Sequence, residues 1–453
     1  MKKKIIAAFL TTAMTIGSLS GVTVFAADAG TDEKVEMADA SDVDGTTITF
    51  WHSMGGVNGE AIDTLVKKFN DENEYGITVD AQYQGEYDDS LNKLKSAQIG
   101  NMGADLVQVY EIGTRFMIDS GWIVPMQQMI DADSYDVSEI EPNLAAYYTI
   151  DNELYSMPFN SSTPIMYYNK DMFEKAGITE VADSLEGIGE IGQDLLDKGG
   201  AGEVMSLGIY GWFFEQFIGK QGLEYANNGN GRKEAATAVA FDENSAAKNI
   251  LTAWKDLNDK GFAPIVGKGG DAGLADFSAG KSAITLGSTA SLKQILQDVN
   301  GKFEVGTAYF PKIKSSDEGG VSIGGASLWA LNNNDPKKLR ATWEFVKFLI
   351  SPESQAYWNA QTGYFPVTVK AQDEQVFKDN VEKYPQFQTA IDQLHDSSAD
   401  YAGALLSVFP EARATVESEI ESMLNGKEDV DTAVKNMADS INKSIEEYNL
   451  VNE

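Results

Sequence analysis

The chain has 453 residues, of which 69 are acidic and 35 basic, and its formal net charge is −34 at pH 7. A field this negative repels nucleic acid and anionic membrane surfaces and excludes both as partners. The length fits two domains or more at ~100 to 200 residues each, and the absence of cysteine excludes disulfides, thiolate metal sites and a lipid-modified N-terminal cysteine.

The N-terminus has the pattern of an export signal. Lys2, Lys3 and Lys4 precede an apolar stretch over residues 5–24, and small residues follow at the end of it. Hydroxyl residues interrupt the stretch, which favours a cleaved signal over a retained anchor. The sequence predicts a signal peptide over residues 1–26 and an acidic, disordered spacer over residues 27–45. We therefore expect a protein of the periplasm or the cell surface, not anchored through cysteine.

The first predicted elements alternate between strands and helices. Alternation over residues 47–51 predicts a strand, Ile62, Leu65 and Phe69 recur at helical spacing, and a second strand follows over residues 77–79. A second helix and a strand over residues 104–110 complete a β-α-β-α-β order. This order is typical of an open, mostly parallel sheet with helices on both faces. Ligands of such sheets bind beyond the carboxyl ends of the strands.

Three later segments carry further patterns. Residues 158–171 begin as a hydroxyl-rich turn, continue as an apolar strand and end in a helix start, a combination that suits an anionic or polyhydroxy ligand. Apolar residues at helical spacing between 246 and 257 predict an amphipathic helix. A stripe from Val434 to Tyr448 predicts a C-terminal helix that packs within a lobe.

The sequence lacks complete motifs for metal binding, nucleotide binding and nucleophilic catalysis. Gly280, Lys281 and Ser282 lack the earlier glycine of a phosphate loop, because Ala275 occupies that position. The only two histidines have no metal-spaced partners, and no nucleophile elbow is present. We expect no cofactor, no metal and no catalytic residue.

Several ordered motifs resemble one family. They are Phe50-Trp51-His52-Ser53-Met54, Gln108-Val109-Tyr110-Glu111, Pro158 through Asp171, Gly324 through Trp329, and Thr362-Gly363-Tyr364. In this order they resemble the extracellular solute-binding proteins of ABC importers, within which the glycerol-3-phosphate-binding proteins are most similar. The resemblance implies an α/β fold of the type II periplasmic-binding-protein class, in which two lobes, each a mixed sheet flanked by helices, are joined by a hinge. It places one lobe at residues 46–159 and 321–362 and the other at 160–320 and 363–453.

The resemblance also implies a set of ligand contacts. Glu111 matches a carboxylate that accepts hydrogen bonds from glycerol hydroxyls, and Arg413 matches the cationic partner of a phosphate. Ser162, Ser288 and the N–H of Gly325 match the other phosphate contacts. The full implied set is Tyr87, Glu111, Ser162, Trp212, Ser288, Gly325, Tyr364 and Arg413. The family pattern has two tryptophans three positions apart, whereas this chain supplies only Trp212. Either Tyr210 replaces the second ring or the ring is lost.

The expected function is that of the substrate-binding component of an ABC transporter. It captures sn-glycerol-3-phosphate or a glycerophosphodiester between its lobes and, as a monomer, delivers it to membrane permease subunits. An oligosaccharide-binding protein of an ABC importer is an alternative, because aromatics and carboxylates also suit sugars. An alternative of another class is a secreted phosphoesterase or glycan hydrolase.

Overall fold

The computed structural model describes residues 35–99, 103–398 and 401–452. The predicted signal peptide, residues 1–26, lies outside the described residues, as does the first part of the predicted spacer. Residues 35–45 do not form a free spacer, because they pack on the first sheet and its helices. Val43 is fully buried, and the Ala38 N–H donates to the Pro336 carbonyl at 3.1 Å. The packed part of the chain therefore begins before residue 46.

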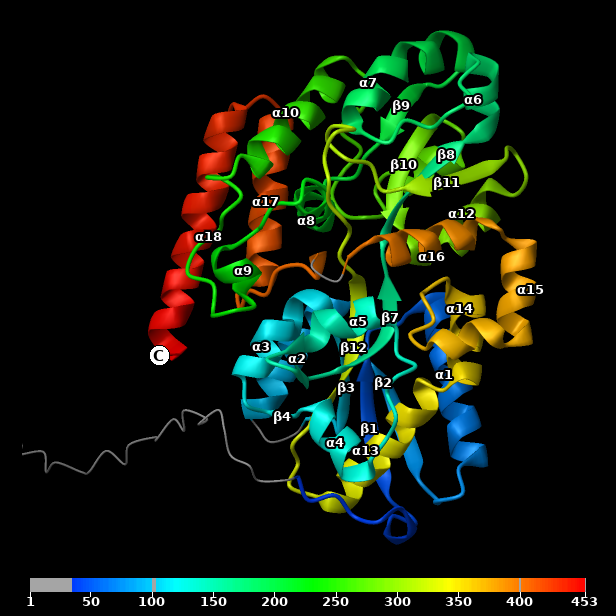
Figure 1. The fold of residues 1–453 in the computed structure, drawn as a ribbon, viewed down its shortest axis with the longest axis vertical. Coiled ribbons are helices and arrows are strands. Elements are labelled where there is room, and N and C mark those ends of the chain that lie inside the picture. The colour runs from blue at the N-terminus through cyan, green and yellow to red at the C-terminus, as the bar shows by residue number, and fades with distance from the viewer. Residues whose placement is uncertain (1–34, 100–102, 399–400, 453) are drawn as a thin grey trace, which may run out of the picture. The chain divides into compact units, whose positions relative to one another are not determined.

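The strands form two main sheets, and helices pack around each to give two lobes (Figure 1). In the first lobe the strand order is β2-β1-β3-β12-β4, with β7 paired to β12. Its strands are β1 (Thr47–His52), β2 (Thr78–Tyr83), β3 (Leu106–Tyr110), β4 (Ile123–Val124), β7 (Met157–Ser162) and β12 (Gly324–Leu331), and a small hairpin adds β5 (Thr149–Ile150) and β6 (Glu153–Leu154). Its helices are α1 (Gly56–Glu72), α2 (Tyr87–Ile99), η2 (Glu111–Gly113), α3 (Thr114–Asp119), α4 (Met126–Asp133), α5 (Pro142–Tyr148), α13 (Pro336–Leu349) and α14 (Pro352–Thr362).

The predicted β-α-β-α-β start is confirmed. Strand β1 is parallel to both β2 and β3, whereas β12 is antiparallel to β3. Alternate residues of β1 point into the core, so that Phe50 is fully buried and its ring meets Phe345 of α13 edge-on at 5.7 Å. The Phe69 ring of α1 packs on the same Phe345 ring, with the two ring centroids 5.0 Å apart. The apolar residues that recur at helical spacing in the sequence therefore form the face by which α1 covers the sheet.

A partly buried ion cluster fixes the end of α4 against α13. The Asp133 carboxylate accepts from Arg340 Nη1 at 2.6 Å, from the Trp343 indole at 2.9 Å and from Lys347 Nζ at 2.8 Å. Partial burial opposes ionisation of this carboxyl, but hydrogen bonds from Lys347, Arg340 and Trp343 outweigh it and lower the pKa of Asp133 to about 2. The cluster therefore stabilises the first lobe only while Asp133 is ionised.

The second lobe is built on a sheet of order β11-β8-β10-β9. Its strands are β8 (Pro164–Asn169), β9 (Glu203–Ser206), β10 (Ser282–Ser288) and β11 (Val305–Tyr309). Its helices are α6 (Lys170–Ala176), α7 (Leu185–Asp194), η3 (Leu195–Gly199), α8 (Gly211–Lys220), α9 (Asn227–Gly231), α10 (Ala246–Asp259), α11 (Leu274–Ser278), η4 (Thr289–Ser291), α12 (Leu292–Val299), α16 (Gln386–Asp396), α17 (Phe409–Leu424) and α18 (Val430–Asn452). The predicted stripe on α18 is confirmed, because Val434, Met437, Ile441 and Ile445 are buried.

The chain crosses between the two sheets after β7, before β12 and again beyond α14. The hydroxyl-rich segment that the sequence predicted as a turn is instead strand β7, in which Asn160, Ser161 and Ser162 pair with β12. The helix start was predicted correctly, since Asn169 caps α6 by accepting the Met172 N–H at 3.1 Å.

The last crossing involves η5 (Val369–Asp373) and α15 (Gln375–Lys383). The chain before η5 is bonded to the first lobe, because the Glu141 N–H donates to the Val367 carbonyl at 2.9 Å and the Val369 N–H to the Glu139 carbonyl at 2.8 Å. We therefore propose that the last lobe boundary lies after α15 rather than at residue 363.

Candidate ligand-binding cleft

A cleft of about 970 Å³ lies between the lobes. All eight residues implied by the resemblance line it, although they come from segments spread over most of the chain. They are Tyr87 of α2, Glu111 of η2, Ser162 of β7, Trp212 of α8, Ser288 of β10, Gly325 of β12, Tyr364 after α14, and Arg413 of α17. The fold therefore brings the whole set to one place.

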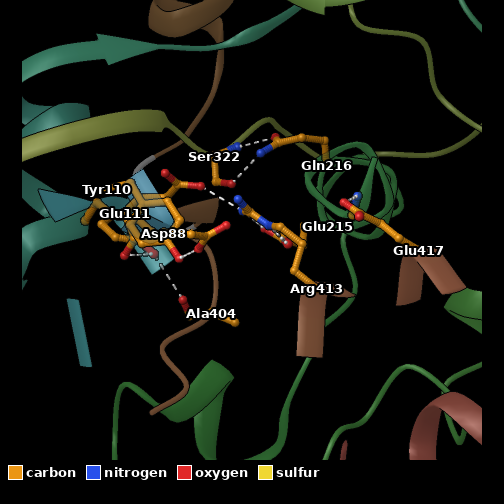
Figure 2. Close-up of polar contacts among 11 residues, drawn as sticks. Asp88, Tyr110, Glu111, Glu215, Gln216, Ser322, Ala404, Arg413 and Glu417 are labelled. Atoms are coloured by element: carbon orange, nitrogen blue, oxygen red, sulfur yellow. Dashed lines mark hydrogen bonds and ion pairs between the residues drawn. The ribbon is translucent and has the colours of Figure 1, made fainter. Parts of the chain in front are cut away.

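Arg413 lies between the carboxylates of Glu111 and Glu215 (Figure 2). Its Nε donates to Glu215 Oε1 at 2.9 Å, and its Nη2 donates to Glu215 Oε2 at 2.8 Å and to Glu111 Oε1 at 2.7 Å. The three side chains are only 9%, 12% and 7% exposed, for Arg413, Glu215 and Glu111 respectively. The guanidinium predicted as a phosphate partner is thus already paired with two carboxylates.

The electrostatics of this cluster follow from burial. Burial opposes the charge of Arg413, but the attraction of Glu215 and Glu111 outweighs it and raises the pKa of the guanidinium. Burial also raises the pKa of Glu215, and Arg413 only partly offsets that shift. One cation balanced by two carboxylates leaves the ionised cluster with a net charge of −1.

Pairing of β7 with β12 explains the glycine at position 325. Gly325 has φ +89°, and a Cβ there would lie 2.0 Å from the Asn160 carbonyl oxygen. The preceding strand position, Gly324, lies against the Trp212 indole, which a Cβ at this glycine would approach to 2.4 Å. Glycine is therefore required at these positions because two strands and an indole approach one another closely.

A hydrogen-bond chain holds the first-lobe wall of the cleft. Tyr87 Oη accepts from Asn160 Nδ2 at 2.8 Å, and Asn160 Oδ1 accepts from Gln108 Nε2 at 2.7 Å. The Tyr87 ring also stacks on Tyr110 at 5.2 Å. Tyr364 lies next to this chain, within hydrogen-bonding reach of Tyr87 and Asn160, and its ring stacks on Trp358 with the ring centroids 5.7 Å apart. Both predicted tyrosines are therefore held in fixed orientations.

Tyr210 lines the cleft beside Trp212, whose ring it meets at 6.1 Å. The Arg413 guanidinium lies 5.6 Å from the Tyr210 ring centroid, within range of a cation–π contact. The Trp212 indole Nε1 is buried and has no hydrogen-bond partner among the described residues.

Sequence reasoning missed the residues that surround Arg413. Glu215 sits in α8 among Trp212, Phe213, Phe214 and Phe217, all of them buried. A single acid in so apolar a helix was a signal that it needs a buried cation. Glu417 was also missed: it accepts the Gly211 N–H at 2.9 Å, and burial raises its pKa.

The described residues contain no cluster of three or more histidine, aspartate or glutamate side chains arranged to hold a metal ion. His52 is packed beside Phe50 and Tyr83, and His395 lies 3.4 Å from Glu141. None of the helices in the described part of the chain combines the length and the apolar character required to cross a bilayer.

Comparisons with known proteins agree on one family. Residues 64–389 match the family model described as bacterial extracellular solute-binding protein. The sn-glycerol-3-phosphate-binding periplasmic protein UgpB of Escherichia coli K12 is 33% identical over 410 residues, which cover 86% of this chain and 91% of the relative. The protein of the same name from Salmonella typhimurium LT2 is 33% identical over 422 residues, 89% of this chain and 93% of the relative.

Two solved structures show the same fold. UgpB from Mycobacterium tuberculosis in complex with glycerophosphocholine has a TM-score of 0.75 at 22% identity and covers 89% of this chain and 99% of its own. The GacH receptor of Streptomyces glaucescens, solved without ligand and with acarbose, has a TM-score of 0.72 at 20% identity and covers 88% of this chain and 98% of its own. At these identities the likeness concerns the two-lobed fold.

Proposed function

Since the chain belongs to the bacterial extracellular solute-binding protein family and is the solute-binding component of an ABC importer, we propose that its cleft captures sn-glycerol-3-phosphate or a glycerophosphodiester. One observation carries the proposal: eight residues from eight segments line a single cleft. The curated relatives at 33% identity are named for binding sn-glycerol-3-phosphate. The ligand would then pass to membrane permease subunits, with the chain acting as a monomer.

The chemistry of the set suits a glycerol phosphate. Ser162 and Ser288 offer hydroxyls, and Arg413 offers its Nη1, which makes no hydrogen bond with any described residue. Planar guanidinium nitrogens match phosphate oxygens well. Glu111 can accept from glycerol hydroxyls with the carboxylate oxygen that Arg413 does not use. A ligand held by both lobes would favour a closed arrangement through contacts that an open one lacks.

An oligosaccharide is the second candidate, and the charge balance of the cleft favours it. Four acids line the cleft and only two bases, and one of the bases, Arg413, is already neutralised. Carboxylates and aromatic rings bind sugar hydroxyls and faces as readily as they bind glycerol. The hydrolase alternative is set aside, because the chain belongs to a family of binding proteins.

Titration calorimetry of the purified exported chain with sn-glycerol-3-phosphate, glycerophosphocholine and maltose separates the candidates. Two adjacent serines supply matched variants. Ser162 lines the cleft, whereas the Ser161 hydroxyl is buried without a partner among the described residues. Ser162→Ala should weaken binding of the phosphate ligand about tenfold, the effect of one hydrogen bond to a charged group, and Ser161→Ala should not. Binding of maltose with no response to either phosphate would refute the assignment.

A further inference from the structure

Glu215 holds Arg413 by one complete edge of the guanidinium. Nε and Nη2 donate to the two oxygens of the same carboxylate at 2.9 and 2.8 Å, which is a bidentate fork. Two parallel bonds fix the guanidinium plane as well as its position. The other edge, formed by Nη1 and Nη2, is the edge left for a ligand, and Glu111 already accepts from its Nη2 at 2.7 Å.

An incoming phosphate therefore meets a site that is negative before it arrives. Its oxygens would compete with Glu111 for Nη2, and its charge would add to a buried cluster that carries two carboxylates and one cation. Buried like charges interact strongly, because little solvent screens them. The lowest-cost remedy for neighbouring buried carboxylates is to bind a proton, as closely spaced acids do elsewhere.

We propose that Glu215 is a positioning residue for Arg413, and that capture of the anionic ligand is accompanied by uptake of a proton on Glu215, which shares Arg413 with Glu111. The proposal rests on the proposed function, since it needs a ligand with a negative charge. It assigns to Glu215 a role that neither the sequence pattern nor the family likeness provides.

The surroundings of Glu215 offer few groups that could compensate in another way. Arg413 is the cation that attracts it most strongly. Glu417 adds a third acid from α17, and burial already raises the pKa of both Glu215 and Glu417. The charged and titratable groups that face the carboxylate are Arg413, Glu417, Glu111, Tyr147, Tyr210 and Tyr225.

The consequence is that affinity depends on pH. A proton taken up on binding strengthens binding as pH falls, by up to about tenfold per unit over the range between the pKa values of the free and the bound protein. Glu215→Gln removes one negative charge while keeping most of the shape. Its affinity for the anion should depend less on pH than that of the native protein, and the loss of one bond of the fork should lower the affinity most at pH 5. A residue that served only to hold the fold would lower the affinity by the same factor at every pH.

Calorimetry in two buffers of different ionisation enthalpy counts the protons directly. Glycerophosphoglycerol is the main probe, because it carries one negative charge and no cation and its phosphodiester does not titrate near neutral pH, whereas a phosphate monoester has a second pKa near ~6. We expect the native protein to take up a substantial fraction of a proton per ligand, Glu215→Gln to take up much less, and Glu446→Gln to behave as native. Glu446 is an exposed acid of α18 that does not line the cleft.

The outcomes separate the two proposals. Absence of heat with glycerophosphoglycerol, glycerophosphocholine and sn-glycerol-3-phosphate alike overturns the proposed function, and the proton coupling falls with it. Binding whose heat is the same in both buffers overturns the coupling alone. Undiminished proton uptake together with weaker binding in Glu215→Gln overturns the assignment to Glu215.

Discussion

Replacing Arg413 with alanine should destabilise the fold as well as remove an expected ligand contact. The side chain is 9% exposed and is the shared partner of Glu111 and Glu215, which are 7% and 12% exposed. Its loss leaves two buried carboxylates without a cationic partner. Removing one partner of a buried ion pair costs about 3 to 5 kcal/mol, because the remaining charge is left without compensation.

The pH dependence of this loss can be worked out from the same geometry. Without Arg413 the folded-state pKa of Glu215 rises further above its unfolded value near ~4.3. The native state then binds more protons than the unfolded state, so the stability of the variant falls as pH rises. We therefore expect the free energy of unfolding to drop by about 3 to 5 kcal/mol at pH 8 and by clearly less at pH 5.

Urea unfolding at the two pH values measures the effect. A matched control is Lys435→Ala, which breaks an exposed i,i+4 pair with Asp439 and should change stability by no more than about 0.5 kcal/mol at either pH. A loss at pH 8 for Arg413→Ala as small as that of the control would show that the buried pairs contribute nothing. A loss that grows on acidification would refute the sign of the argument.

Three further predictions concern positions away from this ion cluster. Asp133→Asn should lower the free energy of unfolding by on the order of 1 to 2 kcal/mol at pH 7, which is the value of the shift to a pKa of about 2 after a discount for solvent screening. The difference from the native protein should vanish between pH ~4 and 2, as Asp133 is protonated. Urea unfolding across that range checks it. Gly325→Ala should destabilise more than Gly301→Ala in thermal melts, because both have positive φ but only position 325 has a carbonyl, that of Asn160, in the way; equal losses would contradict this. Tyr87→Phe should cost about 1 kcal/mol in urea, since Asn160 Nδ2 loses its acceptor, and an unchanged midpoint would contradict the bond.

Local patterns predicted the elements that depend on local physics. The periodicity of Ile62, Leu65 and Phe69 gave the buried face of α1, and the asparagine before Lys170 gave the start of α6. The hydroxyl-rich segment was placed wrongly as a turn, because small polar residues are common in turns. In the fold the same residues form strand β7, in which the backbone pairs with β12.

The amino-acid order by itself determined which side chains are available for binding and, through the family motifs, which eight of them belong together. Only the tertiary structure decided what those side chains can do. Arg413 meets Glu215 across 198 positions and Glu111 across 302. Periodicity and capping act over a few residues, so no local pattern encodes such pairs, and the charge of a binding site is the sum over groups that folding alone makes neighbours.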